Sequence, residues 1–420
     1  MNQYTGRNTK KLVGDTKAFR KLNGVSRSYV QRFKNEIASG RFQLELVVKC
    51  ACCGSNELQG VSSIDRFELP FGSVICEQCG LVSTSPRMKE KDLAYYYSNF
   101  YHPLNYGKEN LAEQDHLFAA GQGADIFDKV SPYLKQGNVR VLEVGCGLGD
   151  VLTGFVQADK TRAYSTVVGT EYSQECLNVA KIRAQNSSLD IKFVEGGCKE
   201  AKLVSSKYDL IILSHVFEHM VNLSAEISNM SDLLEDGGLL YVEVPGLYVN
   251  HMIDYYGYSY TGYSVHAHMY NFCAQTLLNV FQGTEFSCLE INEKVEAVYK
   301  KSAGRTIEKL ENTYNESLFY LNLIGDPEFA SFNISKDDVI KKNNFEILKL
   351  EENERTTKEL LRISKTEVDS VTHENSRLSS SLNSIQELLT DVRRFSIYKA
   401  PYKKYTAYKA LMRLYSNLGQ

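Results

Sequence analysis

The stretch "LSHVFEHM" at residues 213–220 carries three ionisable side chains and follows the apolar run "YDLIIL". His215, Glu218 and His219 would stand at the end of a buried strand, where a neutral imidazole can remove a proton from an acceptor hydroxyl. Imidazoles and a carboxylate can instead hold a divalent ion that acidifies that hydroxyl. If the stretch is helical, His215 and His219 lie four residues apart on one face, with Glu218 beside them. Weaker candidates downstream are Tyr241, Glu243, Tyr263 and Tyr270.

A cluster of cysteines between residues 50 and 79 offers metal binding. The motifs "CACCG" and "CEQCG" each contain a C-x-x-C pair followed by glycine, and the pairs are Cys50/Cys53 and Cys76/Cys79. Two thiolates on one tight turn supply half of a tetrahedral zinc site, and four complete it. The motifs therefore predict a structural zinc ion. Cys52 is expected to be a bystander, although it could replace a member of the first pair, and a set of metal-free core cysteines is the alternative.

The run "VRVLEVGCGLGD" predicts an apolar strand that turns into a helix through a glycine loop. Gly145, Gly147 and Gly149 let the backbone approach a ligand closely. A dinucleotide site would need G-x-G-x-x-G with a pyrophosphate at the helix start, but here the third glycine comes one residue early. Asp150 takes the expected place, and Glu143 adds a second carboxylate. These acids favour a cationic ligand, and a nucleotide-binding domain of another kind is the alternative.

With these motifs, residues 138–246 resemble the class I S-adenosylmethionine (SAM) methyltransferases, whose first motif is an acidic residue followed by G-x-G-x-G. Five segments match in order, "VRVLEVGCGLG", "STVVGTEYS", "IKFVEGGCKEA", "YDLIILSHVFEHM" and "LLEDGGLLYVEVPG". The resemblance implies a Rossmann-like fold in which Glu143 and the loop glycines hold the methionine part of SAM. It also implies that Glu171 binds the ribose hydroxyls, that Cys198 stands near the adenine, and that Ser214 lies beside the methyl donor.

The resemblance extends to both sides of this region. The segments "CGLVSTSPRMKEKDLAYYYSNFY" and "HAHMYNFCAQTLLNVFQGTEF" are similar to segments of methyltransferases that carry an N-terminal zinc-binding module, such as the sugar C-methyltransferases. This similarity implies a carbohydrate acceptor, either a nucleotide-sugar or a surface polysaccharide. From about residue 300 onward the chain departs from those enzymes.

A further similarity concerns the histidines. Small-RNA 2′-O-methyltransferases and a ubiquinone-pathway O-methyltransferase use E-x-x-E-H where this chain has His215, Glu218 and His219, which implies a second divalent metal at these residues. His266 or His268 could complete the site, as a later histidine does in the RNA enzymes. Because the glycine loop and its acids account for SAM, we expect His215 and His219 to act on the acceptor. The alternatives are a hydrogen-bonded Glu218–His219 pair at a helix start and a metalloprotease motif, which the upstream loop disfavours.

The elements that must position these groups fall into six consecutive segments. Between residues 87 and 300, short apolar strands alternate with amphipathic helices, which predicts an α/β domain with a parallel sheet. The segments are a basic helical lead-in (1–45), a zinc-ribbon-like module (46–86), the SAM methyltransferase domain (87–300), a connector (301–334), a coiled coil (335–392) and a basic, Tyr-rich tail (393–420).

The last two segments predict partners. Apolar residues recur at heptad a and d positions from Ile340 to Val392, which predicts a coiled coil and a homodimer. Asn375 at an a position is the kind of residue that sets register in a dimer. One long helix that folds back on the α/β domain is the alternative. The tail "RRFSIYKAPYKKYTAYKALMRLYSNLG" predicts contact with an anionic membrane or an assembly partner, with a solvated helix as the alternative.

Composition limits the remaining classes. The chain is 43% hydrophobic and 24% charged and begins without an apolar leader, so we expect the cytoplasm, with the tail at the inner face of the membrane. A net charge of −3 gives no field that favours nucleic acid. The motifs thus predict SAM-dependent methyl transfer to a carbohydrate. The alternatives are metal-assisted O-methylation of RNA or a small molecule, and a coiled-coil scaffold with a non-catalytic methyltransferase domain, which the intact "EVGCGLG" disfavours.

Overall fold

A computed structural model describes residues 22–109, 117–159, 161–247, 260–302, 304 and 310–325. The chain divides into two units, Met1–Asp326 and Pro327–Gln420, and every described residue belongs to the first. The predicted coiled coil (335–392), the tail (393–420) and residues 1–21 of the lead-in lie outside the described residues. Among the described helices, none has both the length and the apolar character needed to cross a bilayer.

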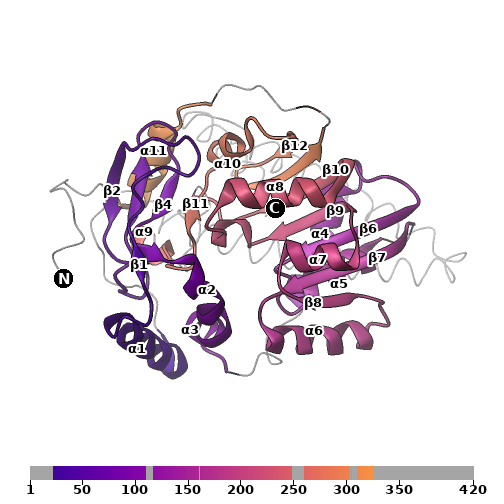
Figure 1. Ribbon diagram of the computed structural model, residues 1–420, viewed down its shortest axis with the longest axis horizontal. Coiled ribbons are helices and arrows are strands. Elements are labelled where there is room, and N and C mark those ends of the chain that lie inside the picture. Colours follow the sequence, from indigo (N-terminus) through magenta and orange to yellow (C-terminus); the bar gives the residue numbers. More distant parts are fainter. Residues whose placement is uncertain are drawn as a thin grey trace, which may run out of the picture. The chain divides into compact units, whose positions relative to one another are not determined.

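The centre of the first unit is a seven-stranded sheet (Figure 1). Strands β8, β7, β6, β9 and β10 are parallel, whereas β13 is antiparallel to β10 and β12. The order reverses at β6, which lies between β7 and β9, and such a switch point is where α/β sheets bind ligands. The predicted Rossmann-like α/β fold is therefore confirmed. In spatial order the strands are β12 (Phe286–Ile291), β13 (Glu296–Lys301), β10 (Leu234–Glu243), β9 (Tyr208–Ser214), β6 (Asn138–Val144), β7 (Ala163–Glu171) and β8 (Lys192–Glu195).

Helices cover both faces of this sheet because strand residues alternate between them. Val141 and Leu210 pack in the cluster under α4 and α5, whereas Leu142 and Ile211 pack in the cluster under α7, α8 and α10. All four side chains are fully buried, and each such burial contributes roughly 1.5–3 kcal/mol. The helices are α4 (Leu117–Val130), α5 (Asp150–Ala158), α6 (Gln174–Asn186), α7 (Cys198–Val204), α8 (Leu223–Leu233) and α10 (Ala274–Phe281).

A smaller four-stranded sheet carries the cysteines. Its strands, in spatial order, are β11 (Tyr270–Asn271), β4 (Val82–Thr84), β3 (Ser73–Cys76) and β2 (Leu58–Ser62). Strand β11 follows the large sheet's β10 in the chain, so the methyltransferase region supplies one strand of the cysteine module. Helix α11 (Tyr314–Gly325), orange in Figure 1, lies beside β2 and β4, and Tyr314 donates a hydrogen bond to Gln59. The predicted connector (301–334) therefore contains a helix that packs on the module.

Residues on both sides of the cysteine motifs extend the module beyond its predicted boundaries. Asn23 is the N-cap of helix α1 (Gly24–Ala38), because its side chain accepts a hydrogen bond from the Ser26 amide at 2.9 Å. Phe33 of this helix packs with Tyr96 and Phe100 in one buried aromatic cluster. The remaining short elements are β1 (Leu44–Glu45), β5 (Arg87–Met88), α2 (Glu90–Tyr96), the π-helical turn η1 (Tyr97–Tyr101), α3 (His102–Tyr106), the 3-10 turn η3 (Phe217–His219) and α9 (Tyr260–Tyr263).

Candidate functional site

The glycine loop connects β6 to α5 at the switch point of the sheet. Gly145 has a φ of 68°, and a Cβ there would lie 2.6 Å from a methyl group of Val216. Gly147 has a φ of 52°, yet a Cβ there would meet no atom of the described residues within 4 Å. Glycine at the first position is therefore needed for packing, whereas the second leaves open space beside the backbone. Gly149, with a φ of 77°, caps α5.

The predicted acids Glu143, Glu171 and Asp150 lie at or beside this loop. Glu143 is 2% exposed, its Oε2 is buried without a hydrogen-bond partner in the described residues, and burial raises the pKa of this carboxyl well above its ordinary value. Glu171 accepts from the amides of Gly147 (3.2 Å) and Ser173 (3.0 Å). Asp150 contacts Arg183, so its charge is compensated within the protein. Glu143 Oε2 is therefore available to accept a hydrogen bond from a cationic ligand group such as an ammonium.

Two further predicted cofactor residues lie at the same edge of the sheet. Cys198 is buried at the first position of α7, and burial raises the pKa of its thiol to about 12. Ser214 ends β9, and its hydroxyl accepts from Gln122 Nε2 at 3.1 Å. The same hydroxyl lies 3.4 Å from a carboxylate oxygen of Glu243. Ser214 thus belongs to the polar network of the histidines.

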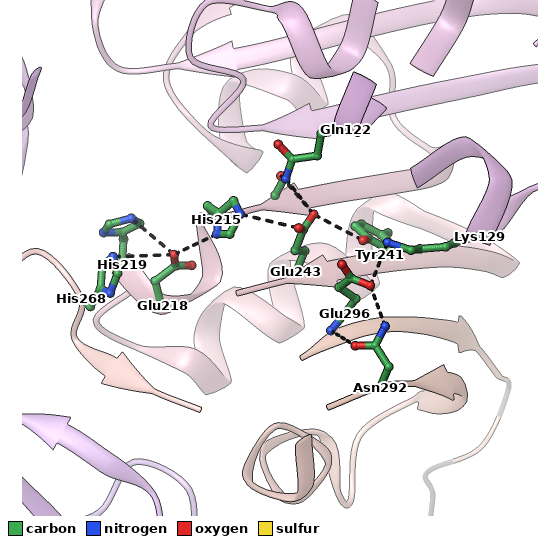
Figure 2. A network of polar contacts seen from close by, with 11 residues as sticks. Gln122, Lys129, His215, Glu218, His219, Tyr241, Glu243, His268, Asn292 and Glu296 are labelled. Carbon is green, nitrogen blue, oxygen red and sulfur yellow. Dashed lines mark hydrogen bonds and ion pairs between the residues drawn. The ribbon is translucent and has the colours of Figure 1, made fainter. Parts of the chain in front are cut away.

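The histidine cluster centres on Glu218, whose side chain is 1% exposed (Figure 2). Both of its carboxylate oxygens are buried, and neither has a hydrogen-bond partner in the described residues. Glu218 Oε1 lies 3.7 Å from His219 Nε2, 3.9 Å from His268 Nε2 and 3.9 Å from His215 Nδ1. Burial raises the pKa of Glu218 to about 8, and Glu243 adds to the effect. Imidazole nitrogens thus surround this buried carboxylate at 3.7–3.9 Å, which is too far for direct hydrogen bonds.

The geometry of His219 defines which of its nitrogens faces Glu218. Its Nδ1 lies 2.9 Å from the Ala267 carbonyl oxygen, so Nδ1 carries the hydrogen and donates. Its Nε2 lone pair then faces Glu218, and burial lowers the pKa of His219 to about 4. Burial also lowers the pKa of His268 well below its ordinary value. A lone pair and a carboxylate repel each other unless a proton or a cation lies between them. One ligand atom from each of Glu218, His219 and His268 lies within 4.8 Å of the others, which is compatible with a divalent ion.

His215 takes part differently from the sequence expectation. The chain forms only a single 3-10 turn at Phe217–His219, so His215 and His219 do not share a helical face. The His215 amide instead donates to the Glu243 carbonyl at 2.8 Å, which continues the sheet pairing, and its φ is 55°. The His215 ring is half-exposed and lies between two carboxylates, with Nε2 3.6 Å from Glu243 Oε1. Both histidines still face Glu218, from opposite sides (Figure 2).

His266 is a corrected candidate, because it lies in the core of the cysteine module. Its ring is fully buried, and Nδ1 lies 2.6 Å from Asp65 Oδ2. The rings of Phe33 and Phe71 pack against it at 5.1 and 5.0 Å between centroids. A turn at His266 and Ala267, in which the His268 amide donates to the Val265 carbonyl at 3.0 Å, separates the two side chains, so His268 reaches Glu218 and His266 does not.

The sequence argument missed the side chains that surround the cluster. Gln122 of α4 donates to Glu243 Oε2 at 3.0 Å, and Glu243 was only a weaker candidate. The rings of Tyr97 and Tyr101 lie edge-on to His219, each with centroids 5.9 Å apart. Only the tyrosine-rich run "YYYSNFY" could have indicated an aromatic cover.

The cysteine cluster is fully assembled. Cys50 Sγ lies 3.5 Å from Cys79 Sγ, and Cys53 Sγ lies 3.5 Å from Cys76 Sγ. The four sulfur atoms all lie within 4.8 Å of one another. Each of these distances joins one cysteine of the first C-x-x-C pair to one of the second. Four thiols at this spacing fit the tetrahedral coordination of a metal ion. Cys52 stays outside this set.

Known proteins resemble the central part of the chain. The family model described as a methyltransferase domain matches residues 114–291. The ubiquinone biosynthesis O-methyltransferase of Brucella anthropi is 28% identical over 179 residues, which cover 42% of this chain and 64% of the relative. That of Brucella ovis is 29% identical over the same length. The match therefore spans somewhat less than two thirds of these curated relatives.

Among solved structures, the magnesium protoporphyrin IX methyltransferase of Synechocystis PCC 6803 is 15% identical, with a TM-score of 0.38. The alignment covers 51% of this chain and 100% of the Synechocystis chain. A methyltransferase structure from Bacillus halodurans is 17% identical, covers 40% of this chain and 71% of that chain, and has a TM-score of 0.32.

Proposed function

Since residues 114–291 form a class I SAM-dependent methyltransferase domain, we propose that the chain methylates a hydroxyl oxygen of an acceptor held at Glu218, His219 and His268. The observation that carries this proposal is the buried Glu218 carboxylate without a hydrogen-bond partner in the described residues. Imidazole nitrogens surround it at 3.7–3.9 Å, at the carboxyl edge of the sheet. The curated relatives are named O-methyltransferases, which supports oxygen as the methylated atom.

The loop side of the site would hold the cofactor. SAM, when bound, supplies an electrophilic methyl group on a sulfonium. Glu143 offers Oε2, which has no hydrogen-bond partner in the described residues, to the cationic methionine part, and the open backbone at Gly147 allows close approach. Glu171 could accept from ribose hydroxyls, since a carboxylate has about four lone-pair sites and its partners within the described residues are backbone amides.

The histidine side would prepare the acceptor. Glu218, His219 and His268 would hold a divalent ion, which lowers the pKa of a hydroxyl bound to it. His215 is half-exposed beside this cluster, so it can take the hydroxyl proton and pass it to solvent. In the simpler mechanism without metal, neutral His215 or His219 acts as the base alone.

For the acceptor we propose a carbohydrate, as the likeness to enzymes with a cysteine module implies. Both segments that carry this likeness border the site: Tyr97 and Tyr101 cover His219, and the "HAHMY" segment supplies His268. Aromatic rings beside carboxylates are suited to a sugar, because rings pack on its C–H faces and carboxylates accept from its hydroxyls. The relatives' part in ubiquinone biosynthesis makes a phenol the second candidate.

For the cysteine cluster we propose one structural zinc ion. Four sulfurs leave no coordination position for substrate, so this ion would stabilise the module rather than react.

The test is methyl transfer from labelled SAM by the full-length chain to nucleotide-sugars, catechols and RNA. We expect transfer to a sugar hydroxyl, loss of transfer on mild chelation, and recovery with Mg²⁺ or Mn²⁺, while SAM binding persists throughout. Transfer that survives complete removal of metal from the histidine cluster would support the base mechanism. Binding of SAM without transfer to any acceptor class, or no SAM binding, would contradict the proposal.

A further inference from the structure

The segment that carries His268 runs between the two sheets and is held from both sides. On the methyltransferase side, the Met269 amide donates to the Glu218 carbonyl at 2.7 Å. His219 Nδ1 donates to the Ala267 carbonyl at 2.9 Å. Glu218 and His219 thus bind the backbone on either side of His268.

On the other side, Thr84 of the cysteine module holds the same peptide units. Its hydroxyl donates to the His268 carbonyl at 2.5 Å, and its amide donates to the Met269 carbonyl at 3.0 Å. The next residues continue this contact as strand pairing, with Tyr270 opposite Ser83. Thr84 is 1% exposed, so water does not compete for its hydrogen bonds.

Thr84 and Cys76 also belong to two paired strands of one hairpin. Strand β3 ends at Cys76 and pairs with β4, so that Ile75 lies opposite Val82 and Ser73 lies opposite Thr84. The turn that carries Cys76 and the residue that holds His268 are therefore two ends of the same hairpin. A change in the fold of this hairpin would move His268.

From this geometry we propose that Thr84 is a positioning residue for His268, and that the cysteine module is a structural part of the acceptor site. The inference rests on the proposed role of the histidine cluster. His268 Nε2 reaches Glu218 at 3.9 Å only if its backbone stays in place, and a displacement of about 1 Å can reduce catalysis roughly 100-fold.

The experiment uses the full-length, zinc-loaded protein and Mn²⁺ as the probe, because Mn²⁺ prefers oxygen and nitrogen ligands over cysteines. Thr84→Val removes the hydroxyl donor and keeps shape and strand pairing. We expect it to weaken Mn²⁺ binding and lower kcat roughly 10- to 100-fold, the usual effect of losing a group that orients a ligand. The Kd for SAM should stay unchanged, and Thr84→Ser should restore both properties.

Ser73→Ala is the matched control. Ser73 lies on the neighbouring strand and accepts a hydrogen bond from Tyr260 at 2.8 Å, so this variant loses one buried hydrogen bond in the same sheet without touching His268. Equal losses in Ser73→Ala and Thr84→Val would overturn the inference, because general loosening of the module would explain both.

His268→Ala separates the inference from the proposed function. If Thr84→Val keeps wild-type Mn²⁺ affinity and kcat while His268→Ala loses them, the inference is wrong and the proposed function stands. If His268→Ala also keeps both, the histidine cluster has no role in the reaction and the two proposals fall together.

Discussion

The two groups of side chains that could hold a metal ion are assembled in opposite ways. The cysteine cluster takes its four ligands from two C-x-x-C turns of one small module. The cluster of Glu218, His219 and His268 takes two ligands from the turn after β9 and one from the segment before β11. The first cluster is local to the module, whereas the second exists only when the large sheet and the module are both folded.

This difference corresponds to different chemistry. Four sulfurs saturate a tetrahedral ion, so the cysteine cluster can stabilise but offers no position to a substrate. Three oxygen and nitrogen ligands leave positions open for an acceptor hydroxyl. A local, closed cluster should therefore control folding, and a composite, open one should control turnover. The predictions below test that division.

The largest effect is expected at the cysteines. Cys76→Ser should abolish binding of the proposed zinc ion and unfold the module, because structural zinc contributes apparent binding free energies of about 10–16 kcal/mol. Zinc content by mass spectrometry and thermal unfolding by circular dichroism measure both consequences. Cys52→Ser is the control and should keep one zinc per chain. A zinc-free protein with an unchanged thermal transition would show that the cluster does not control folding.

The next effect is expected at the histidine cluster. His219→Ala should lower kcat by roughly 10²–10⁴, the usual contribution of a group that acts on the acceptor proton. SAM affinity should change less than a few-fold, because the proposed SAM-binding residues Glu143 and Glu171 lie at the glycine loop. Isothermal titration with SAM and a steady-state assay separate the two. A loss of SAM binding that matches the loss of rate would place His219 on the cofactor side instead.

The cysteine cluster and the glycine loop could be predicted from the sequence because their geometry is local. A C-x-x-C-G turn brings Cys50 and Cys53 together whatever surrounds it, and the strand before Gly145 leads into its loop without distant partners. The parallel sheet also followed from alternating strands and helices. In each case the decisive residues are neighbours in the chain.

The acceptor side could be predicted only in part, because it depends on distant contacts. The sequence offered His266 and His268 equally, and contacts with distant segments distinguish them, because His266 lies against Asp65 whereas His268 faces Glu218. His215 and His219 do not share the expected helical face, because the His215 amide makes a sheet hydrogen bond to the Glu243 carbonyl. Neither contact leaves a pattern in the local sequence.

A smaller effect, dependent on pH, is expected at His102, which packs against Tyr101, one of the two rings that cover His219. His102 Nε2 lies 3.2 Å from Cys176 Sγ, and burial lowers the pKa of His102 from 6.5 to about 4. Between these pH values the unfolded chain binds a proton that the folded chain does not. The stabilisation is therefore complete above pH 6.5 and is lost as pH falls towards 4, by at most roughly 3 kcal/mol at about 1.4 kcal/mol per pKa unit.

His102→Phe should remove this pH dependence. Urea unfolding at pH 7 and pH 4.5 should show that the wild type loses more stability on acidification than the variant does. If both proteins lost the same amount of stability on acidification, His102 would be hydrated in the folded state and its surroundings less tightly packed than the cysteine module.

The smallest effect is expected at Gln122, and it tests how far the open cluster extends. Gln122 donates to Glu243 Oε2 at 3.0 Å and to Ser214 Oγ at 3.1 Å, and Glu243 in turn lies 3.6 Å from His215. Gln122→Met keeps the length of the side chain but removes the donor, so Glu243 is held less firmly. One hydrogen bond of this kind contributes about 1 kcal/mol, which corresponds to a loss of roughly fivefold in kcat with unchanged SAM affinity.

Gln31→Met is the matched control for Gln122→Met, because Gln31 also bonds through Nε2, to Asn35 at 3.0 Å, but on the exposed surface of α1. We expect the control to have wild-type kcat. If Gln122→Met also has wild-type kcat, the cluster ends at Glu218 and its histidines, and Glu243 only supports the sheet. If the variant instead loses a few-fold in kcat, the open cluster extends through His215 and Glu243 to α4.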